Sequence, residues 1–326
     1  MLGNRPDERP GVVDGALFRP ETIPQGAIMA IALAPSVVAG LLLFRERAAL
    51  IAAVAIAIGG SIGLIARLAR LPGAGAALAN AVIGAALCGP LAAPGWAAGI
   101  ALTAAVTELL RARFWPASRI STGLLAYAAA YLAGSGVVAA YARPSAPGLM
   151  FPEPIQQWSR FYGGAARFLD PVTLYVGNVA GPALCTSLLA VALGLAWLWY
   201  ARRLSLISLA GFLVTGTLMS LALRWDPVFQ LDSGPAWFVV GFTLADRTLL
   251  PAEPRARPVL AAATGVIALG LRAANLYIEA LPLVAVALQL VFSAVEAMAR
   301  ALMPRLLPGS RRVIARRPTE TEPVSG

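Results

Sequence analysis

The chain has 326 residues, of which 59% are hydrophobic and 13% are charged, and its mean hydropathy is +0.74. A soluble domain carries roughly 25% charged residues, so this chain has too few charges to cover a water-exposed surface. The composition therefore predicts a polytopic membrane protein. In a soluble protein the net charge of +10 would suggest a nucleic-acid partner, but here the arginines lie in short loops between apolar runs. Nucleic acid is therefore not an expected partner.

The chain contains no histidine, and Cys88 and Cys185 are its two cysteines. This excludes histidine as a proton shuttle or metal ligand, and it excludes any self-contained four-thiolate cluster. Both cysteines lie inside apolar runs, so we interpret them as small buried hydrophobic residues. The alternative is a metal site shared with another chain.

Apolar runs long enough to cross about 30 Å of hydrocarbon, roughly 20 residues each, recur along the whole chain. They predict transmembrane helices near 25–44, 48–66, 74–92, 94–110, 120–141, 175–200, 204–223, 235–250, 258–273 and 280–303. The expected fold class is therefore an all-α polytopic membrane protein with about ten transmembrane helices.

Loop arginines orient these helices. With the N-terminus in the cytoplasm, the inner loops and the C-terminal tail hold most of the loop arginines: Arg67, Arg70, Arg111, Arg113, Arg119, Arg202, Arg203, Arg247, Arg255, Arg257, Arg311, Arg312, Arg316 and Arg317. Arg45 and Arg47 are the main exception, in an outer connection. The positive-inside rule then predicts that both termini are cytoplasmic. No cleavable signal peptide is evident, because the polar N-terminal segment is long and no small-residue cleavage site follows it.

One long outer segment, 143–174, lies midway along the chain and is rich in proline, glycine and aromatic residues. We expect either an ordered amphipathic cap or an interfacial segment with its aromatic rings at headgroup level. This gives five parts: a cytoplasmic segment 1–24, a five-helix half 25–142, the outer loop 143–174, a second five-helix half 175–303 and a basic cytoplasmic tail 304–326. Because each half has an odd number of spans, an internal repeat would be inverted.

Two glycine pairs lie inside predicted spans, Gly59 with Gly60 and Gly134 with Gly136. Glycine lets helix backbones approach closely in a membrane, so we expect these residues to serve helix packing. Arg272 and Glu279 flank an outer turn, where they could pair.

The most informative acid is Asp246, which ends the apolar run that begins at Ala236 and precedes a loop of prolines and arginines. A carboxylate at the end of a membrane span is costly unless it is solvated, paired or used. The structural interpretation is an interface carboxylate that pairs with Arg247 or Arg255, or that caps a helix. The functional interpretation places Asp246 on a cytoplasmic entry route for a cation, together with Glu108 and Glu296, which also lie near inner ends of spans.

The residues around Asp246 also carry a resemblance to a known family. LADRTLLP followed by PRAR is similar to a family pattern that reads ATDPVTSP followed by PRGR, except that Arg247 replaces a proline. Tyr277, Glu279, Gln289 and Glu296 occur at the spacing of the polar residues in that family's last span. On these residues the chain resembles the RnfD/NqrB family, the flavin-bearing membrane subunits of ion-pumping electron-transport complexes.

This resemblance implies electron transfer through FMN at the outer face. In the segment that would hold the FMN, however, this chain differs from the family pattern. The family attaches FMN to the threonine of an S/T-G-A-T motif, whereas the corresponding position here is Ala166, which has no hydroxyl. A second family segment keeps Asn178, Thr186 and Ser187 but has Cys185 in place of a glutamate. The resemblance thus implies a member that has lost covalent attachment, and any FMN or other flavin would bind non-covalently, with Asn178, Thr186 and Ser187 as candidates.

The function implied is that of a membrane subunit of a redox-driven, ion-translocating electron-transport complex, with no catalytic residue of its own. Its partners would be the lipid bilayer and the other membrane and peripheral subunits of the complex. Its location would be the bacterial cytoplasmic (inner) membrane, which it would cross several times. The alternative is a flavin-free transporter, channel or assembly scaffold built on the same fold, since fold does not fix function.

Overall fold

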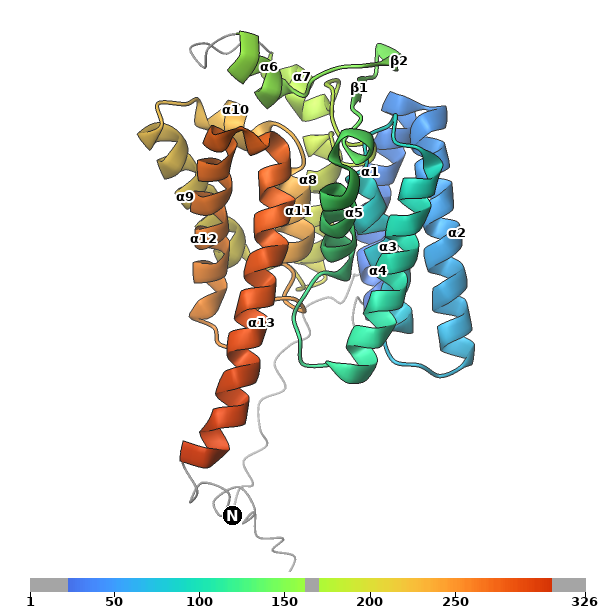
Figure 1. Cartoon of the computed structure of the whole chain (residues 1–326), viewed down its shortest axis with the longest axis vertical. Helices are drawn as coiled ribbons and strands as arrows, with labels where there is room; N and C mark the ends of the chain where they lie inside the picture. Colours follow the sequence, from blue (N-terminus) through green and yellow to red (C-terminus); the bar gives the residue numbers. More distant parts are fainter. Residues whose placement is uncertain (1–22, 162–169, 307–326) are drawn as a thin grey trace, which may run out of the picture.

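The computed structural model describes residues 23–161 and 170–306 of the chain (Figure 1). This part is mainly helical, with one short antiparallel pair of strands, β1 (Ala142–Arg143) and β2 (Ala146–Met150). The expectation of an all-α fold is confirmed. The helices are α1 (Gln25–Phe44), α2 (Glu46–Leu68), α3 (Ala74–Ala86), α4 (Pro94–Phe114), α5 (Thr122–Val138), α6 (Pro154–Phe161), α7 (Pro171–Val176), α8 (Leu188–Tyr200), α9 (Leu206–Ala222), α10 (Pro227–Asp232), α11 (Ala236–Val239), α12 (Ala256–Leu271) and α13 (Ala280–Leu306). Short turns of other helix types are η2 (Val240–Leu244), η3 (Arg272–Leu276) and η4 (Tyr277–Glu279).

Within residues 23–161 and 170–306, three stretches of helix are long and apolar enough to cross a membrane: α1, α2 and the combined stretch Ala256–Leu302. Four shorter apolar helices, α3, α5, α8 and α9, lie among them. Large apolar side chains face outward on several helices, and Leu42 and Leu132 are 76% and 77% exposed. Long apolar helices with exposed apolar faces are the features of a membrane protein.

Each of the ten predicted spans contains a helix, but three are helical over only part of their length. Helix α3 ends at Ala86, helix α8 begins only at Leu188, and α11 with η2 covers only 236–244. Pro90 and Pro182 lie in two of the non-helical stretches, and proline removes a donor that a helix needs. Apolar composition alone does not reveal such breaks.

The non-helical stretches bond to one another, which satisfies backbone groups that a membrane interior cannot hydrate. The Ala183 N–H donates to the Cys88 carbonyl at 2.8 Å, and the Gly89 N–H donates to the Val138 carbonyl at 2.9 Å. The segment after α3 is thereby joined both to the end of α5 and to the segment before α8.

Helix packing crosses the boundary between the two sequence halves. Helix α1 packs on α8, while α13 packs on both α12 and α5 (Figure 1). Glycine allows close approach at several contacts, since a Cβ at Gly59 would press on Ala81 and a Cβ at Gly134 would press on Trp96. A Cβ at Gly60 or Gly136 would meet nothing within 4 Å, so the packing expectation was right for one glycine of each pair and wrong for the other.

The described part of the long middle loop forms a cap over one end of the helices. We use "the cap" for residues 142–161, which contain β1, β2 and α6; in Figure 1 they lie at the top with α7 and α10. A separate apolar cluster holds the cap in place, and Trp158 packs edge-on against Trp225 with ring centroids 5.3 Å apart. Trp158 is only 6% exposed, which favours the ordered cap over the interfacial segment.

Candidate functional site

Asp246 lies just beyond η2, at the end of the molecule opposite the cap, and it is 1% exposed. Its two carboxylate oxygens accept from Nε and Nη2 of Arg203 at 2.8 and 2.7 Å. The same carboxylate accepts from the backbone N–H of Thr248 at 3.1 Å. The sequence predicted that Asp246 pairs with Arg247 or Arg255, and this prediction was wrong. Arg203 lies in the loop between α8 and α9, and the backbone of Arg247 pairs with that loop.

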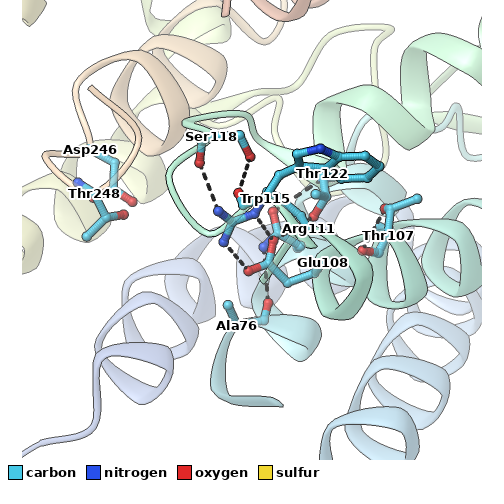
Figure 2. Close-up of polar contacts among 12 residues, drawn as sticks. Ala76, Thr107, Glu108, Arg111, Trp115, Ser118, Thr122, Asp246 and Thr248 are labelled. Carbon is cyan, nitrogen blue, oxygen red and sulfur yellow. Dashed lines mark hydrogen bonds and ion pairs between the residues drawn. The ribbon is translucent and has the colours of Figure 1, made fainter. Parts of the chain in front are cut away.

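Glu108 lies near the end of α4 and is 2% exposed. Arg111, one turn further on, donates to both oxygens of this carboxylate at 3.0 and 2.6 Å. Thr122, at the start of α5, donates to it at 3.2 Å. Arg111 also donates to the Ser118 carbonyl at 2.9 Å, which fixes the loop between α4 and α5 (Figure 2). The result is a bidentate ion pair in which the glutamate is buried and the arginine is partly exposed.

Both ion pairs line one cavity of about 150 Å³. Glu108 and Arg111 come from α4, whereas Asp246 and Arg203 come from segments of the second half (Figure 2). Apolar atoms of Met29 and Phe242 and the amide of Asn80 complete much of the lining. Carboxylate, amide and hydroxyl oxygens are the ligands that hard cations prefer, and each carboxylate here is already neutralised by a two-pronged arginine.

Glu296, the third candidate acid, lies outside this cavity. It lines a smaller neighbouring pocket with Gln289, Ser293 and Arg119, and Leu249 contributes to both pockets. Its carboxylate accepts from the Ala252 N–H at 2.7 Å and lies 4.0 Å from the Arg119 guanidinium. The structure therefore brings Glu108 and Asp246 together and leaves Glu296 at an adjoining position.

Two side-chain amides satisfy backbone groups at the broken ends of helices. Gln289 accepts from the Ser121 N–H at 2.9 Å and donates to the Thr243 carbonyl at 3.3 Å. Asn80 accepts from the Gly123 N–H at 3.2 Å. Asn80 was missed in the sequence analysis, although an amide inside an apolar span was a usable signal. The role of Arg203 carried no such signal, because loop arginines are expected from topology alone.

The three candidate flavin residues do not share one pocket. Asn178 is exposed and lines a cavity of about 210 Å³ beneath the cap, together with Arg143, Thr173 and Gln157. Ser187 caps α8 by accepting from the Ala190 N–H at 3.4 Å. Thr186 is buried, and its hydroxyl has no hydrogen-bond partner among the described residues. Ala166 lies outside the described residues.

The two cysteines are buried near each other at the junction between the halves. Cys185 donates to the Ala86 carbonyl at 3.4 Å, and Cys88 directly follows the helical turn that ends α3. Within 23–161 and 170–306 there is no group of three or more His, Cys, Asp or Glu residues that could hold a metal ion.

The cap end holds a second set of buried polar residues. Tyr141 donates to Glu279 at 2.8 Å, and Arg272 donates to the Gln230 backbone carbonyl. Arg272 and Glu279, which were expected to pair across their turn, form hydrogen bonds with other partners, and no ion pair within 4.0 Å joins these two described residues. No protein-family model matches the chain, and no curated protein is found to be similar to it.

Proposed function

We propose that this chain is a membrane subunit of a redox-driven, ion-translocating electron-transport complex of the RnfD/NqrB kind. One observation carries the proposal: Glu108 and Asp246, which are buried acids from different halves of the chain, line the same cavity. A buried carboxylate in a membrane protein is costly and often marks an ion path, so two that line one cavity are candidates for the path of a cation.

Because each carboxylate is paired with an arginine, the cavity is stable without a bound cation. Arg111 neutralises Glu108 and Arg203 neutralises Asp246, so an empty cavity carries little net charge. A cation that enters must compete with a guanidinium for its carboxylate. Such competition couples ion binding to movement of Arg111 at the end of α4 and of the loop that holds Arg203, and this is the type of step that a redox change in a partner subunit would drive.

The topology proposed is that of ten spans in two inverted five-helix halves, with both termini and the Glu108–Asp246 cavity on the cytoplasmic side. In support, the third helix of each half is short: α3 has 13 residues, and α11 with η2 occupies only 236–244. Broken helices at corresponding positions of two halves are typical of inverted-repeat transporters. The cap then lies at the outer face of a bacterial cytoplasmic membrane.

We place a non-covalently bound FMN, or another flavin, at the cavity beneath the cap. Arg143 would hold an anionic group of the cofactor and Asn178 would hydrogen-bond to it, because both line this space. Flavin would supply the electron transfer, while this chain would bind and orient it. Other membrane and peripheral subunits would contribute the remaining redox centres.

A flavin-free transporter, channel or scaffold is the second candidate. It is favoured by the alanine at 166 and by the position of Ser187, whose hydroxyl caps α8 and donates to the Tyr175 carbonyl. A hydroxyl used twice within the protein has little capacity left for a cofactor.

One purification distinguishes the two candidates. The chain is expressed with its neighbouring gene products and its flavin-insertion machinery, and its absorption spectrum is recorded before and after denaturation. We expect flavin that is released on denaturation and no fluorescent band on a denaturing gel. A preparation without flavin, combined with ion or solute flux in liposomes that needs no electron donor, would support the second candidate instead.

A further inference from the structure

Three buried charged side chains lie at the junction between the cap and the helices below it, where Ile155 and Ile278 belong to one apolar cluster. Glu153 precedes α6, Arg272 follows α12 and Glu279 precedes α13; they are 2%, 5% and 6% exposed. Arg272 interacts electrostatically with both glutamates, and the glutamates interact with each other. Two carboxylates and one guanidinium leave one negative charge unbalanced in a site shielded from water, where such a charge is costly.

Each carboxylate is held in position by donors of the protein. Glu153 accepts from the backbone N–H groups of Ile155 at 2.6 Å and Gln156 at 2.9 Å, so it caps α6. Glu279 accepts from the Tyr141 hydroxyl at 2.8 Å. The site is therefore built from the cap on one side and from the turn between α12 and α13 on the other.

Unpartnered polar atoms adjoin this cluster and indicate that it takes up a small polar ligand. Nε of Arg272 and Nε2 of Gln230, whose backbone carbonyl accepts from Arg272, are buried donors without a hydrogen-bond partner among the described residues. A buried donor without an acceptor costs about 1–3 kcal/mol, which a bound water molecule removes. Water beside two carboxylates is the setting in which a proton can be held and exchanged.

We propose that Glu153 and Glu279 share one proton beside Arg272, in a hydrated site that joins the cap to the helices. With this proton the site contains one neutral carboxyl and one carboxylate that balances Arg272. Two carboxylates in one site titrate as a pair, and the first proton to bind is held tightly because it relieves their repulsion. The site is independent of flavin and of the Glu108–Asp246 cavity.

The surroundings of Glu153 agree with this assignment. Burial, and secondarily the charge of Glu279, raise the pKa of Glu153 to about 8, although its two backbone donors and Arg272 act in the opposite direction. The remaining titratable groups that face the site are Tyr141, which contacts Glu279, and Tyr127 and Tyr131 on α5. Cys88 interacts electrostatically with Tyr127.

Infrared spectroscopy of the purified full-length protein tests the proposal, because a protonated carboxyl has a carbonyl band distinct from that of a carboxylate. The chain has no histidine, so few other side chains titrate near neutral pH. We expect one protonated carboxyl in the wild type that is lost as the pH rises through about 8. E153Q should abolish this change and E279Q should shift it to lower pH, because the charge of Glu279 is then missing, whereas E253Q, which alters an exposed acid in the loop before α12, should leave it unchanged.

The proposal would be overturned by a wild type without a titrating carboxyl near this pH, by a titration that persists in E153Q, or by one that is unchanged in E279Q. If one variant does not fold, the other variant and the wild-type titration still decide. The difference in tryptophan fluorescence between the wild type and W158F adds a local readout, because the Trp158 ring packs against Trp225 at the junction between cap and helices. The emission of Trp158 should change with pH in the wild type and stay constant in E153Q.

Discussion

Arg203 and Asp246 are 43 residues apart in the sequence, yet their side chains form a bidentate ion pair at 2.8 and 2.7 Å. Arg203 also donates to Thr248, at 3.2 Å. The pair therefore ties the loop between α8 and α9 to the non-helical segment that follows η2, and it does so at the wall of the Glu108–Asp246 cavity.

Replacing Arg203 by glutamine should destabilise the protein by about 3 kcal/mol, because it leaves Asp246 buried without its countercharge. Thermal unfolding in detergent measures the loss. The double variant R203Q/D246N should recover much of it, since it removes both charges. The matched control is R202Q, a neighbouring exposed arginine, which should be neutral. If R203Q and R202Q were equally stable, the ion pair would contribute nothing.

Glu108→Gln tests the ion path. The amide keeps the shape of the side chain but cannot balance a cation, so ion translocation by the reconstituted complex should fall by about tenfold or more, the effect of roughly 1.4 kcal/mol. Ion uptake into liposomes is the readout, with electron transfer measured in parallel. The exposed acid Glu253 provides the control as E253Q. Unchanged ion uptake in E108Q would remove Glu108 from the path.

The sequence indicated both acids of this cavity but could not show that they meet. Each stood out because a carboxylate in an apolar run is costly, which is a local property of the chain. Their proximity depends on how segments from the two halves come together around one cavity, and the identity of Arg203 as a partner depends on how the loop before α9 pairs with the segment after η2. These are long-range relationships that no local pattern encodes.

The difference between local patterns and long-range contacts also explains where the predicted spans were wrong. Helix was correctly predicted in all ten apolar segments, because apolar runs bounded by arginine loops are a strong signal. The predicted spans were too long where the chain runs non-helically through the interior, as after Ala86 and before Leu188. Such stretches are as apolar as helices, and their backbone N–H and C=O groups form hydrogen bonds with residues far away in the sequence. Glu153 was missed because it lies in a loop, where an acid is unremarkable.

Ser187→Ala separates a structural role from a cofactor role. The Ser187 hydroxyl caps α8, so its loss should cost about 1 kcal/mol of stability and leave the flavin content unchanged. Arg143→Gln, which alters the cavity beneath the cap, should instead lower the ratio of flavin to protein. Absorbance of the released flavin, normalised to protein, gives the comparison. If S187A lost flavin and R143Q did not, the cofactor site would lie at the start of α8 instead.

The stability of the protein should depend on pH through Glu153. Its pKa is 4.5 as a free side chain and about 8 in the fold, so the folded state binds the proton more tightly. This contribution is complete below pH 4.5 and is lost as the pH rises to about 8, a change on the order of a few kcal/mol. Thermal unfolding across this range should show falling stability in the wild type. A shallower slope is expected in E153Q, and equal slopes would contradict the assignment.

Gly194 and Gly60 provide a matched pair of glycine-to-alanine changes that tests the packing of the two halves. A Cβ at Gly194, on α8, would collide with the Ala32 carbonyl of α1, whereas a Cβ at Gly60, on α2, would meet nothing within 4 Å. G194A should therefore destabilise the protein by about 1–3 kcal/mol, because one helix must move away from the other. G60A should be neutral or stabilising by up to about 1 kcal/mol, because alanine favours a helix more than glycine does. Thermal unfolding of the two variants in the same detergent gives the comparison. Equal stability of G194A and G60A would show that α1 and α8 do not pack at this distance.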